Sequence, residues 1–83
     1  MNPELPSAPD YAQLGQALRS LRNRAGLTQV QAADKIGVRD NFLSQIENGK
    51  RGMRWHTLLA ILNTYDADLR HLADAIDEAS AQP

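Results

Sequence analysis

Apolar residues recur along most of the chain at intervals of three and four positions, the spacing that places side chains on one face of an α-helix. Together with the residues that start and stop helices, this pattern predicts five helices, which we expect at about residues 10–25, 28–36, 40–48, 55–65 and 68–78. The sequence therefore predicts an all-α fold.

The chain of 83 residues is the right length for one small domain, which we place at residues 10–78. Residues 1–9 contain three of the four prolines and no periodic apolar pattern, so we expect them to form a flexible N-terminal arm. Residues 79–83 follow the last apolar stripe, and we expect this tail to fray.

The second and third helices are predicted to meet at a tight turn. Thr28 can cap the second helix, because its hydroxyl can accept from a free backbone N–H and Gln31 can return the bond. Gly37 can end that helix in the left-handed conformation that residues with a side chain resist. Two short helices around a glycine-containing turn match the helix-turn-helix description, in which the second helix can lie in a DNA major groove.

The third helix has one apolar face and one polar face. Leu43 and Ile46 lie three positions apart and are expected to face inward. The opposite face is rich in amides and is formed by Asn41, Ser44, Gln45 and Asn48. Gly49 follows as a second stop signal.

A longer pattern extends from about Leu14 to Leu72. It consists of Leu18, Leu21, Arg22, the run Gly26-Leu27-Thr28-Gln29, Ala33, Ile36, Gly37-Val38, Leu43-Ser44, the run Ile46-Glu47-Asn48-Gly49-Lys50-Arg51, and Thr57-Leu58-Leu59. With these residues the chain resembles the Xre-like, or Cro/cI-type, helix-turn-helix DNA-binding domains of phage repressors and small bacterial regulators. The resemblance implies a compact five-helix, lambda-repressor-like domain that binds double-stranded DNA.

The resemblance also implies which residues meet DNA. The positions that face base edges in the family correspond to Arg39, Asp40, Asn41, Ser44 and Gln45. The positions that hold the phosphate backbone correspond to Thr28, Gln29, Asn48, Lys50 and Arg51. Base contacts would set specificity, and phosphate contacts would set register and salt dependence. By the same resemblance, Arg22 and Glu47 form a structural ion pair.

Hydrogen-bonding capacity suggests particular bases. Asn41 or Gln45 can bond adenine through N6 and N7, and Arg39 can pair with guanine. Arg39, however, stands where relatives usually have a Ser or Thr cap. Asp40 could accept from cytosine N4, or it could pair with Arg39 and neutralise it. Phe42 could touch a thymine methyl group or pack against the domain.

The charges are unevenly distributed. The whole chain has a formal net charge of −1, but the segment 19–54 has eight Lys and Arg residues against three Asp and Glu residues, a balance of +5. The remainder is acidic. A positive segment of this kind is the electrostatic footprint that phosphate binding requires.

Several kinds of chemistry are excluded or unexpected. The chain has no cysteine, which excludes disulfides, thiolate metal sites and cysteine nucleophiles. His56 and His71 lie on separate predicted helices without a metal or nucleophile motif, so we expect no metal, no cofactor and no enzyme. Neither a signal peptide nor a membrane-spanning apolar run is evident, and we expect a cytoplasmic protein without membrane contact.

The last two helices are strongly apolar. Trp55 begins a stripe that continues with Leu58, Leu59 and Leu62, so we expect this helix to be buried on more than one side and Trp55 to lie in the core. In the last helix, the expected stripe contains Leu69, Leu72 and Ile76. So small a core cannot cover all three, and we expect them to form the interface of a homodimer on a palindromic site.

The leading functional hypothesis is a homodimeric, sequence-specific transcriptional regulator, most often a repressor in this family. One alternative is the antitoxin of a toxin–antitoxin pair, with a toxin as its protein partner, or the controller of a restriction-modification system. Another alternative is a protein-binding adaptor that has lost DNA binding, which the acidic overall balance would allow.

Overall fold

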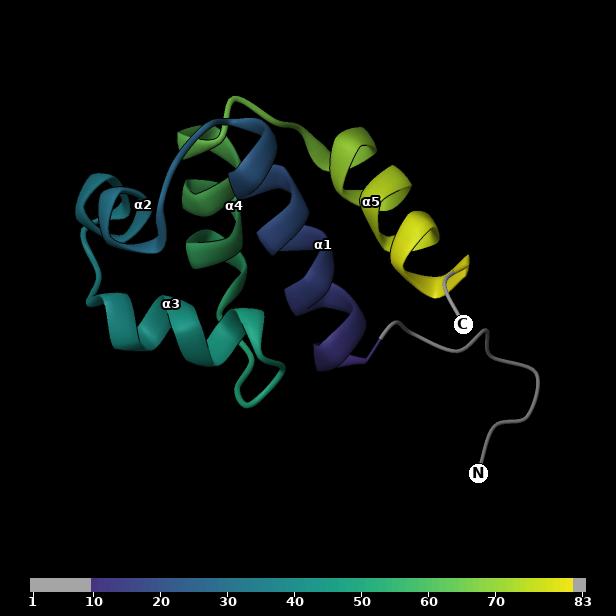
Figure 1. Cartoon of the computed structure of the whole chain (residues 1–83), viewed down its shortest axis with the longest axis horizontal. Helices are drawn as coiled ribbons and strands as arrows, with labels where there is room; N and C mark the ends of the chain where they lie inside the picture. The colour runs from purple at the N-terminus through teal and green to yellow at the C-terminus, as the bar shows by residue number, and fades with distance from the viewer. Residues whose placement is uncertain (1–9, 82–83) are drawn as a thin grey trace.

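In a computed structural model, which describes residues 10–81, the chain forms five α-helices. They are α1 (Tyr11–Arg24), α2 (Gln29–Ile36), α3 (Asp40–Glu47), α4 (Trp55–Thr64) and α5 (Leu69–Ala81). Figure 1 shows α1 in the middle of the molecule, with α2, α3 and α4 on one side and α5 on the other. The predicted all-α, five-helix fold is confirmed, and the arm expected at residues 1–9 lies outside the described residues.

The first two helices begin where the capping residues predict. The Gln13 backbone N–H donates to Asp10 Oδ1 over 2.8 Å, and the Asp10 N–H donates to Gln13 Oε1 over 3.1 Å. Thr28 and Gln31 form the same reciprocal pair over 3.1 and 3.0 Å. Each pair satisfies backbone donors that a helix start leaves free. At the other end of α2, Gly37 adopts a left-handed φ of +90°.

The core is built from aliphatic side chains of α1, α3 and α4. Its largest fully buried members are Leu18, Leu43, Ile46 and Ile61. The buried residues of α2 are Ala32 and Ala33, whose small side chains allow neighbouring helices to approach closely. This arrangement holds α3 firmly by its inner face.

Gly15 brings the backbone of α1 next to the end of α3. A Cβ atom at this position would press into the backbone carbonyl groups of Ile46 and Glu47. No side chain larger than hydrogen fits between the two helices there, so Gly15 sets their spacing. The role of Gly15 is not visible in the sequence, because helical periodicity does not show where two helices cross.

The expectation that Trp55 lies in the core is wrong. Trp55 is 61% exposed and Leu59 is 40% exposed, whereas Ile61, Leu62 and Tyr65 are buried. The buried residues of α4, Ile61 and Leu62, lie in its second half, whereas Trp55 at its start is exposed. A mostly apolar helix therefore presents an apolar edge to solvent.

Helix α5 also differs from expectation. Leu72 and Ala75 are buried, at 6% and 1% exposed, while Leu69 is 48% exposed and Ile76 is half-buried. Leu72 therefore belongs to the monomer core and is not available to a second subunit, because α5 lies along α1 with this side inward. Asp68 caps the helix as predicted, accepting from the His71 N–H over 2.9 Å.

Residues 79–81 were expected to fray, but they continue α5 as far as Ala81. Gln13 Nε2 donates to Ser80 Oγ over 2.9 Å, so the end of α5 has a partner on the first turn of α1. Residues 82–83 lie outside the described part. None of the described helices is both long and apolar enough to cross a membrane.

Candidate nucleic-acid interface

The turn between α2 and α3 is held by local backbone bonds. The N–H groups of Gly37 and Val38 both donate to the carbonyl of Ala33, over 2.9 and 3.0 Å. The left-handed Gly37 lets the chain double back to this shared acceptor. Two eight-residue helices joined in this way form the predicted helix-turn-helix.

Helix α3 has one buried face and one accessible polar face, as its sequence predicts. Leu43, Ile46 and Glu47 are buried. Asp40 and Asn41 are exposed. Ser44 and Gln45 are half-buried, as is expected for side chains that rise from the edge of a packed helix. All the residues expected to contact bases are accessible to some degree, and their contact with bases stays a prediction.

Arg39 and Asp40 begin α3 without forming an ion pair within residues 10–81. Asp40 Oδ1 instead accepts from the Asn41 N–H over 2.9 Å. Arg39 occupies the cap position and makes no side-chain cap bond, so its guanidinium extends into solvent. The structure thus has no sign of the mutual neutralisation that the sequence left open.

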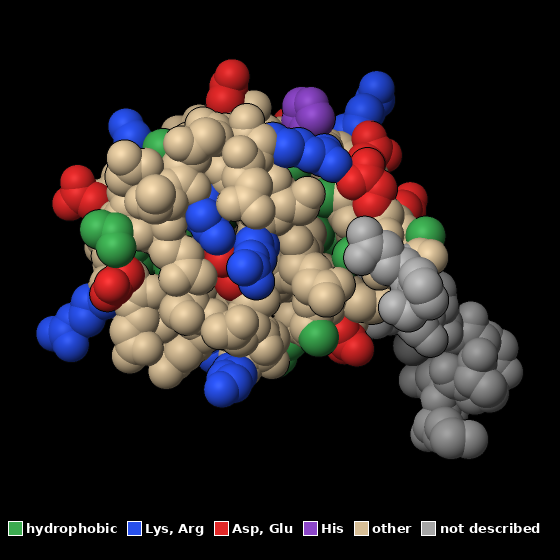
Figure 2. Space-filling view, in the orientation of Figure 1, with side chains coloured by type: hydrophobic (Ala, Val, Ile, Leu, Met, Phe, Trp, Pro, Cys, Tyr) green, Lys and Arg blue, Asp and Glu red, His purple; other side chains and the backbone are tan. Residues whose placement is uncertain are grey.

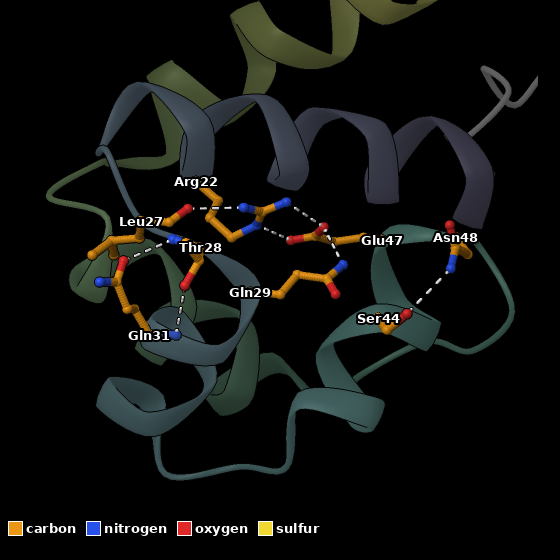
Figure 3. A network of polar contacts seen from close by, with 8 residues as sticks. All are labelled: Arg22, Leu27, Thr28, Gln29, Gln31, Ser44, Glu47 and Asn48. Carbon is orange, nitrogen blue, oxygen red and sulfur yellow. Dashed lines mark hydrogen bonds and ion pairs between the residues drawn. The ribbon is translucent and has the colours of Figure 1, made fainter.

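Asn48 lies one turn beyond Ser44 and is linked to it. Asn48 Nδ2 donates to Ser44 Oγ over 3.3 Å, as Figure 3 shows. This bond occupies an acceptor position of Ser44 and leaves its hydroxyl hydrogen free to donate. A residue expected to contact phosphate is therefore coupled to one expected to contact a base.

Arg51 lies over α3 instead of extending from the loop that follows it. Its guanidinium carbon is 4.5 Å from the centre of the Phe42 ring, which is the geometry of a cation–π contact. Arg51 Nη1 also donates to Gln45 Oε1 over 3.2 Å. The family resemblance places Arg51 among the phosphate contacts, and nothing in the sequence connects it with Phe42 or Gln45. Neighbouring Lys50 remains exposed.

A buried polar network ties α3 to α1 and α2 (Figure 3). Arg22 Nε donates to Glu47 Oε2 over 2.7 Å, and Arg22 Nη2 donates to Glu47 Oε1 over 3.0 Å. Arg22 Nη1 donates to the carbonyl of Leu27 over 2.8 Å. The two charged side chains are only 9% and 1% exposed. The ion pair that the family resemblance implied is therefore present, buried and bidentate.

Gln29 joins this network at the start of α2. Its Nε2 donates to Glu47 Oε1 over 2.9 Å, which uses one of its two amide hydrogens and leaves the other free. The hydrogen bond to Glu47 raises the pKa of Arg22, so the guanidinium stays charged. Burial raises the pKa of nearby Tyr65, so the phenol stays neutral beside the pair. The network fixes how α3 sits against both other helices.

The basic side chains of segment 19–54 fall into two groups. Arg22 and Arg24 are paired, the latter with Glu78 of α5. The other group is exposed and forms no ion pair within residues 10–81; it consists of Arg19, Lys35, Arg39, Lys50, Arg51 and Arg54. Figure 2 shows basic side chains spaced over the visible face, with acidic side chains around its edge and a group of them at the upper right. Four exposed cations flank α3 in sequence, one before it and three after it.

Comparisons with known proteins agree with this geometry. A family model described as a helix-turn-helix domain matches residues 13–76. The chain is 37% identical over 59 residues to the HTH-type transcriptional regulator ImmR of Bacillus subtilis, a match that covers 71% of this chain and 46% of ImmR. It is 31% identical over 75 residues to the HTH-type transcriptional regulator PrpR of Mycobacterium tuberculosis, which covers 88% of this chain and 15% of PrpR. The chain thus spans less than half the length of these curated relatives.

Two solved structures have the same fold. The clp gene regulator ClgR from Corynebacterium glutamicum superposes with a TM-score of 0.73 at 30% identity, covering 89% of this chain and 95% of ClgR. The restriction-modification controller protein C.AhdI from Aeromonas hydrophila superposes with a TM-score of 0.70 at 29% identity, covering 75% of this chain and 94% of C.AhdI. The chain therefore belongs to the helix-turn-helix domain family, of the Xre-like, Cro/cI type.

Proposed function

We propose that this chain is a sequence-specific DNA-binding transcriptional regulator that inserts the outer face of α3 into the major groove of double-stranded DNA. The observation that carries the proposal is the division of α3, whose inner face is locked by Leu43, Ile46 and the buried Glu47 while its outer amides are accessible. The relatives that match the chain are transcriptional regulators. The proposal places the chain in the cytoplasm, where bacterial DNA lies.

Affinity and specificity are assigned to different side chains. Arg39, Asp40, Asn41, Ser44 and Gln45 are proposed to face bases. Backbone N–H groups at the start of α2 are proposed to hold phosphates, together with Thr28, Gln29, Asn48, Lys50 and Arg51. Lys50 and Arg39 are exposed at opposite ends of α3, so they can attract the DNA backbone on both sides of the inserted helix.

The test is selection from a pool of random DNA duplexes, followed by affinity measurements on the selected duplex and on an unrelated one. We expect a clear preference and a loss of affinity of about 100-fold or more between 50 and 200 mM salt, because phosphate contacts release counterions. Asn41→Ala should lose about 1–3 kcal/mol on the selected duplex only. Asn23→Ala, an exposed change on α1, is the control.

Absence of any sequence preference would contradict the proposed function. Binding that does not weaken with added salt would favour the adaptor alternative, since such binding would not depend on phosphates. If the wild-type chain binds no duplex but captures a protein partner, the adaptor is again favoured. The last two outcomes therefore separate a DNA-binding regulator from a protein-binding module.

We also propose that the regulator acts as a homodimer through an apolar edge formed by Trp55, Leu59 and Leu69. Trp55 and Leu59 lie four residues apart on one face of α4, and Leu69 begins α5 nearby. Leu59 and Leu69 line an open hollow of about 540 Å³. A second copy would cover this edge and would place two α3 helices about 34 Å apart, one DNA turn, on a palindromic operator.

Changing Leu69 to Asp should convert the dimer to a monomer. Leu69 is 48% exposed in one subunit, so an interface can bury about half of this side chain in each copy. Losing both burials costs about 1.5–3 kcal/mol, which weakens dimerisation by about tenfold to 100-fold. Light scattering across a concentration series measures this change. Val30→Asp, at an exposed apolar position on α2, should leave the oligomeric state unchanged. A wild-type chain that stays monomeric even on its operator would contradict the dimer.

A second candidate function is control of a restriction-modification system, favoured by the similarity to C.AhdI. The antitoxin alternative has the same DNA-binding face and adds a toxin as partner. Neighbouring genes distinguish the three roles, because a controller lies beside a nuclease and methyltransferase and an antitoxin lies beside its toxin. Repression is our expectation for the regulator, and transcription from a reporter that carries the selected duplex tests it.

A further inference from the structure

Arg51 is held in one orientation by two contacts that come from α3. Its guanidinium lies over the Phe42 ring, 4.5 Å from the ring centre. Phe42 is itself half-buried and packs against the hydrophobic core, so it is a fixed platform. The guanidinium is planar, and its place over a fixed ring restricts the directions in which its N–H groups point. An arginine that extends freely into solvent is not restricted in this way.

The second contact determines how the Gln45 amide is turned. Arg51 Nη1 donates to Gln45 Oε1 over 3.2 Å. Arginine has only donors, so the amide must present its oxygen to Arg51 and its Nε2 on the other side. Gln45 and Phe42 are three residues apart and therefore share a side of α3 with Asn41, which is exposed.

The contact with Arg51 changes which hydrogen-bonding groups Gln45 can offer to a base. Gln45 Nε2 offers two hydrogens, and the free N–H groups of Arg51 offer more donors. A glutamine that recognises adenine must accept from N6 with its oxygen while it donates to N7. Here the oxygen already accepts from a cation, and an adenine amino group would have to approach beside that cation. Guanine has two acceptors, N7 and O6, on its major-groove edge.

We infer that Arg51 and Gln45, stacked on Phe42, act as one base-recognition unit that offers donors only and selects guanine. The inference rests on the proposed function and deepens it by naming a base and a specificity residue. It replaces the expectation from single side chains that Gln45 bonds adenine. It also moves Arg51 from the phosphate contacts to the base contacts.

The alternative role for Arg51 is that of a simple phosphate contact. A phosphate contact supplies affinity that is independent of sequence, so its loss weakens all duplexes alike and lowers the salt slope by about one. Loss of a base-recognition residue also changes which base is preferred. The two roles of Arg51 are therefore distinguished by whether its loss changes the preferred base at one base pair or weakens binding to all duplexes alike.

The experiment begins with wild-type selection from random duplexes. The base pair recognised by the unit is identified as the one at which Gln45→Ala abolishes discrimination. We expect guanine there, preferred over adenine by about tenfold or more, the order of magnitude of one bidentate base contact. Arg51→Ala should abolish this preference or shift it to adenine, because the released Gln45 oxygen can then accept from N6.

Arg51→Lys is the sharper variant, because it keeps the positive charge but cannot stack as a plane or donate through a rigid fork. It should also lose the guanine preference, and Phe42→Leu should do the same by removing the platform. Lys50→Ala is the matched control, since it removes an exposed neighbouring cation and should weaken all duplexes equally. Thermal melting of each variant checks that the domain remains folded.

Three results would overturn the inference while leaving the proposed function intact. The first is a preference for adenine at the identified base pair. The second is the absence of any base pair at which Gln45→Ala changes discrimination. The third is an Arg51→Ala variant that weakens binding to all duplexes uniformly, as Lys50→Ala does. Failure of the wild-type chain to prefer any duplex is different, because it would contradict the proposed function itself.

Discussion

Replacing Glu47 with alanine is expected to destabilise the domain by about 3–5 kcal/mol, because it leaves the charge of Arg22 buried without its partner. That is a large fraction of the total stability of a small domain. Glu47 is 3% exposed and accepts three hydrogen bonds, two from Arg22 and one from Gln29. The same change removes a link between α3 and the start of α2, so DNA affinity should fall as well.

Urea unfolding followed by circular dichroism measures the loss of stability. The matched control is Glu78→Ala, which breaks the exposed pair with Arg24 and should cost at most about 1 kcal/mol, because exposed ion pairs are well solvated. Combining Arg22→Met with Glu47→Leu should recover much of the loss, since it removes both charges together. An equal effect of Glu47→Ala and Glu78→Ala would contradict the role of the buried pair.

Gly15→Ala is expected to destabilise the domain by about 1–3 kcal/mol, even though alanine is the better helix former. A new Cβ would lie 2.7 Å from the backbone carbonyl oxygen of Glu47 and closer still to that of Ile46. Backbone cannot move aside as a flexible side chain can. The added methyl group must therefore push α1 and α3 apart and disturb the helix that is proposed to enter DNA.

The midpoint of urea unfolding also measures this effect, and Gln16→Ala is its control. Gln16 is the next residue of α1 and is exposed, so its replacement should change stability by less than about 0.5 kcal/mol. A Gly15→Ala variant as stable as the wild type would show that the α1–α3 contact can widen without cost.

The features that the sequence alone predicted are those with local causes. Thr28 with Gln31, and Asp10 with Gln13, begin helices because each pair satisfies backbone groups within one turn. Gly37 ends α2 because of its own backbone freedom. The two faces of α3 follow from helical periodicity. Such features depend on residues three or four apart, so a single sequence contains the information.

The features that were missed or mistaken depend on contacts between distant parts of the chain. Periodicity showed that α4 and α5 have apolar faces, but it did not show which residues their neighbours cover. Trp55 is therefore exposed and Leu72 is buried, against expectation. The role of Gly15 appears only where α1 crosses the end of α3.

The sequence by itself thus determined the five helices, the glycine turn and the polar face of α3, because short-range hydrogen bonds and spacing specify them. Only the tertiary structure decided that the Arg51 side chain lies over Phe42 and donates to Gln45. The conformation of a long side chain in a loop depends on the residues that surround it in space. The tertiary structure also decided that Leu59 and Leu69 stay uncovered, because burial is a property of packed helices and not of any one of them.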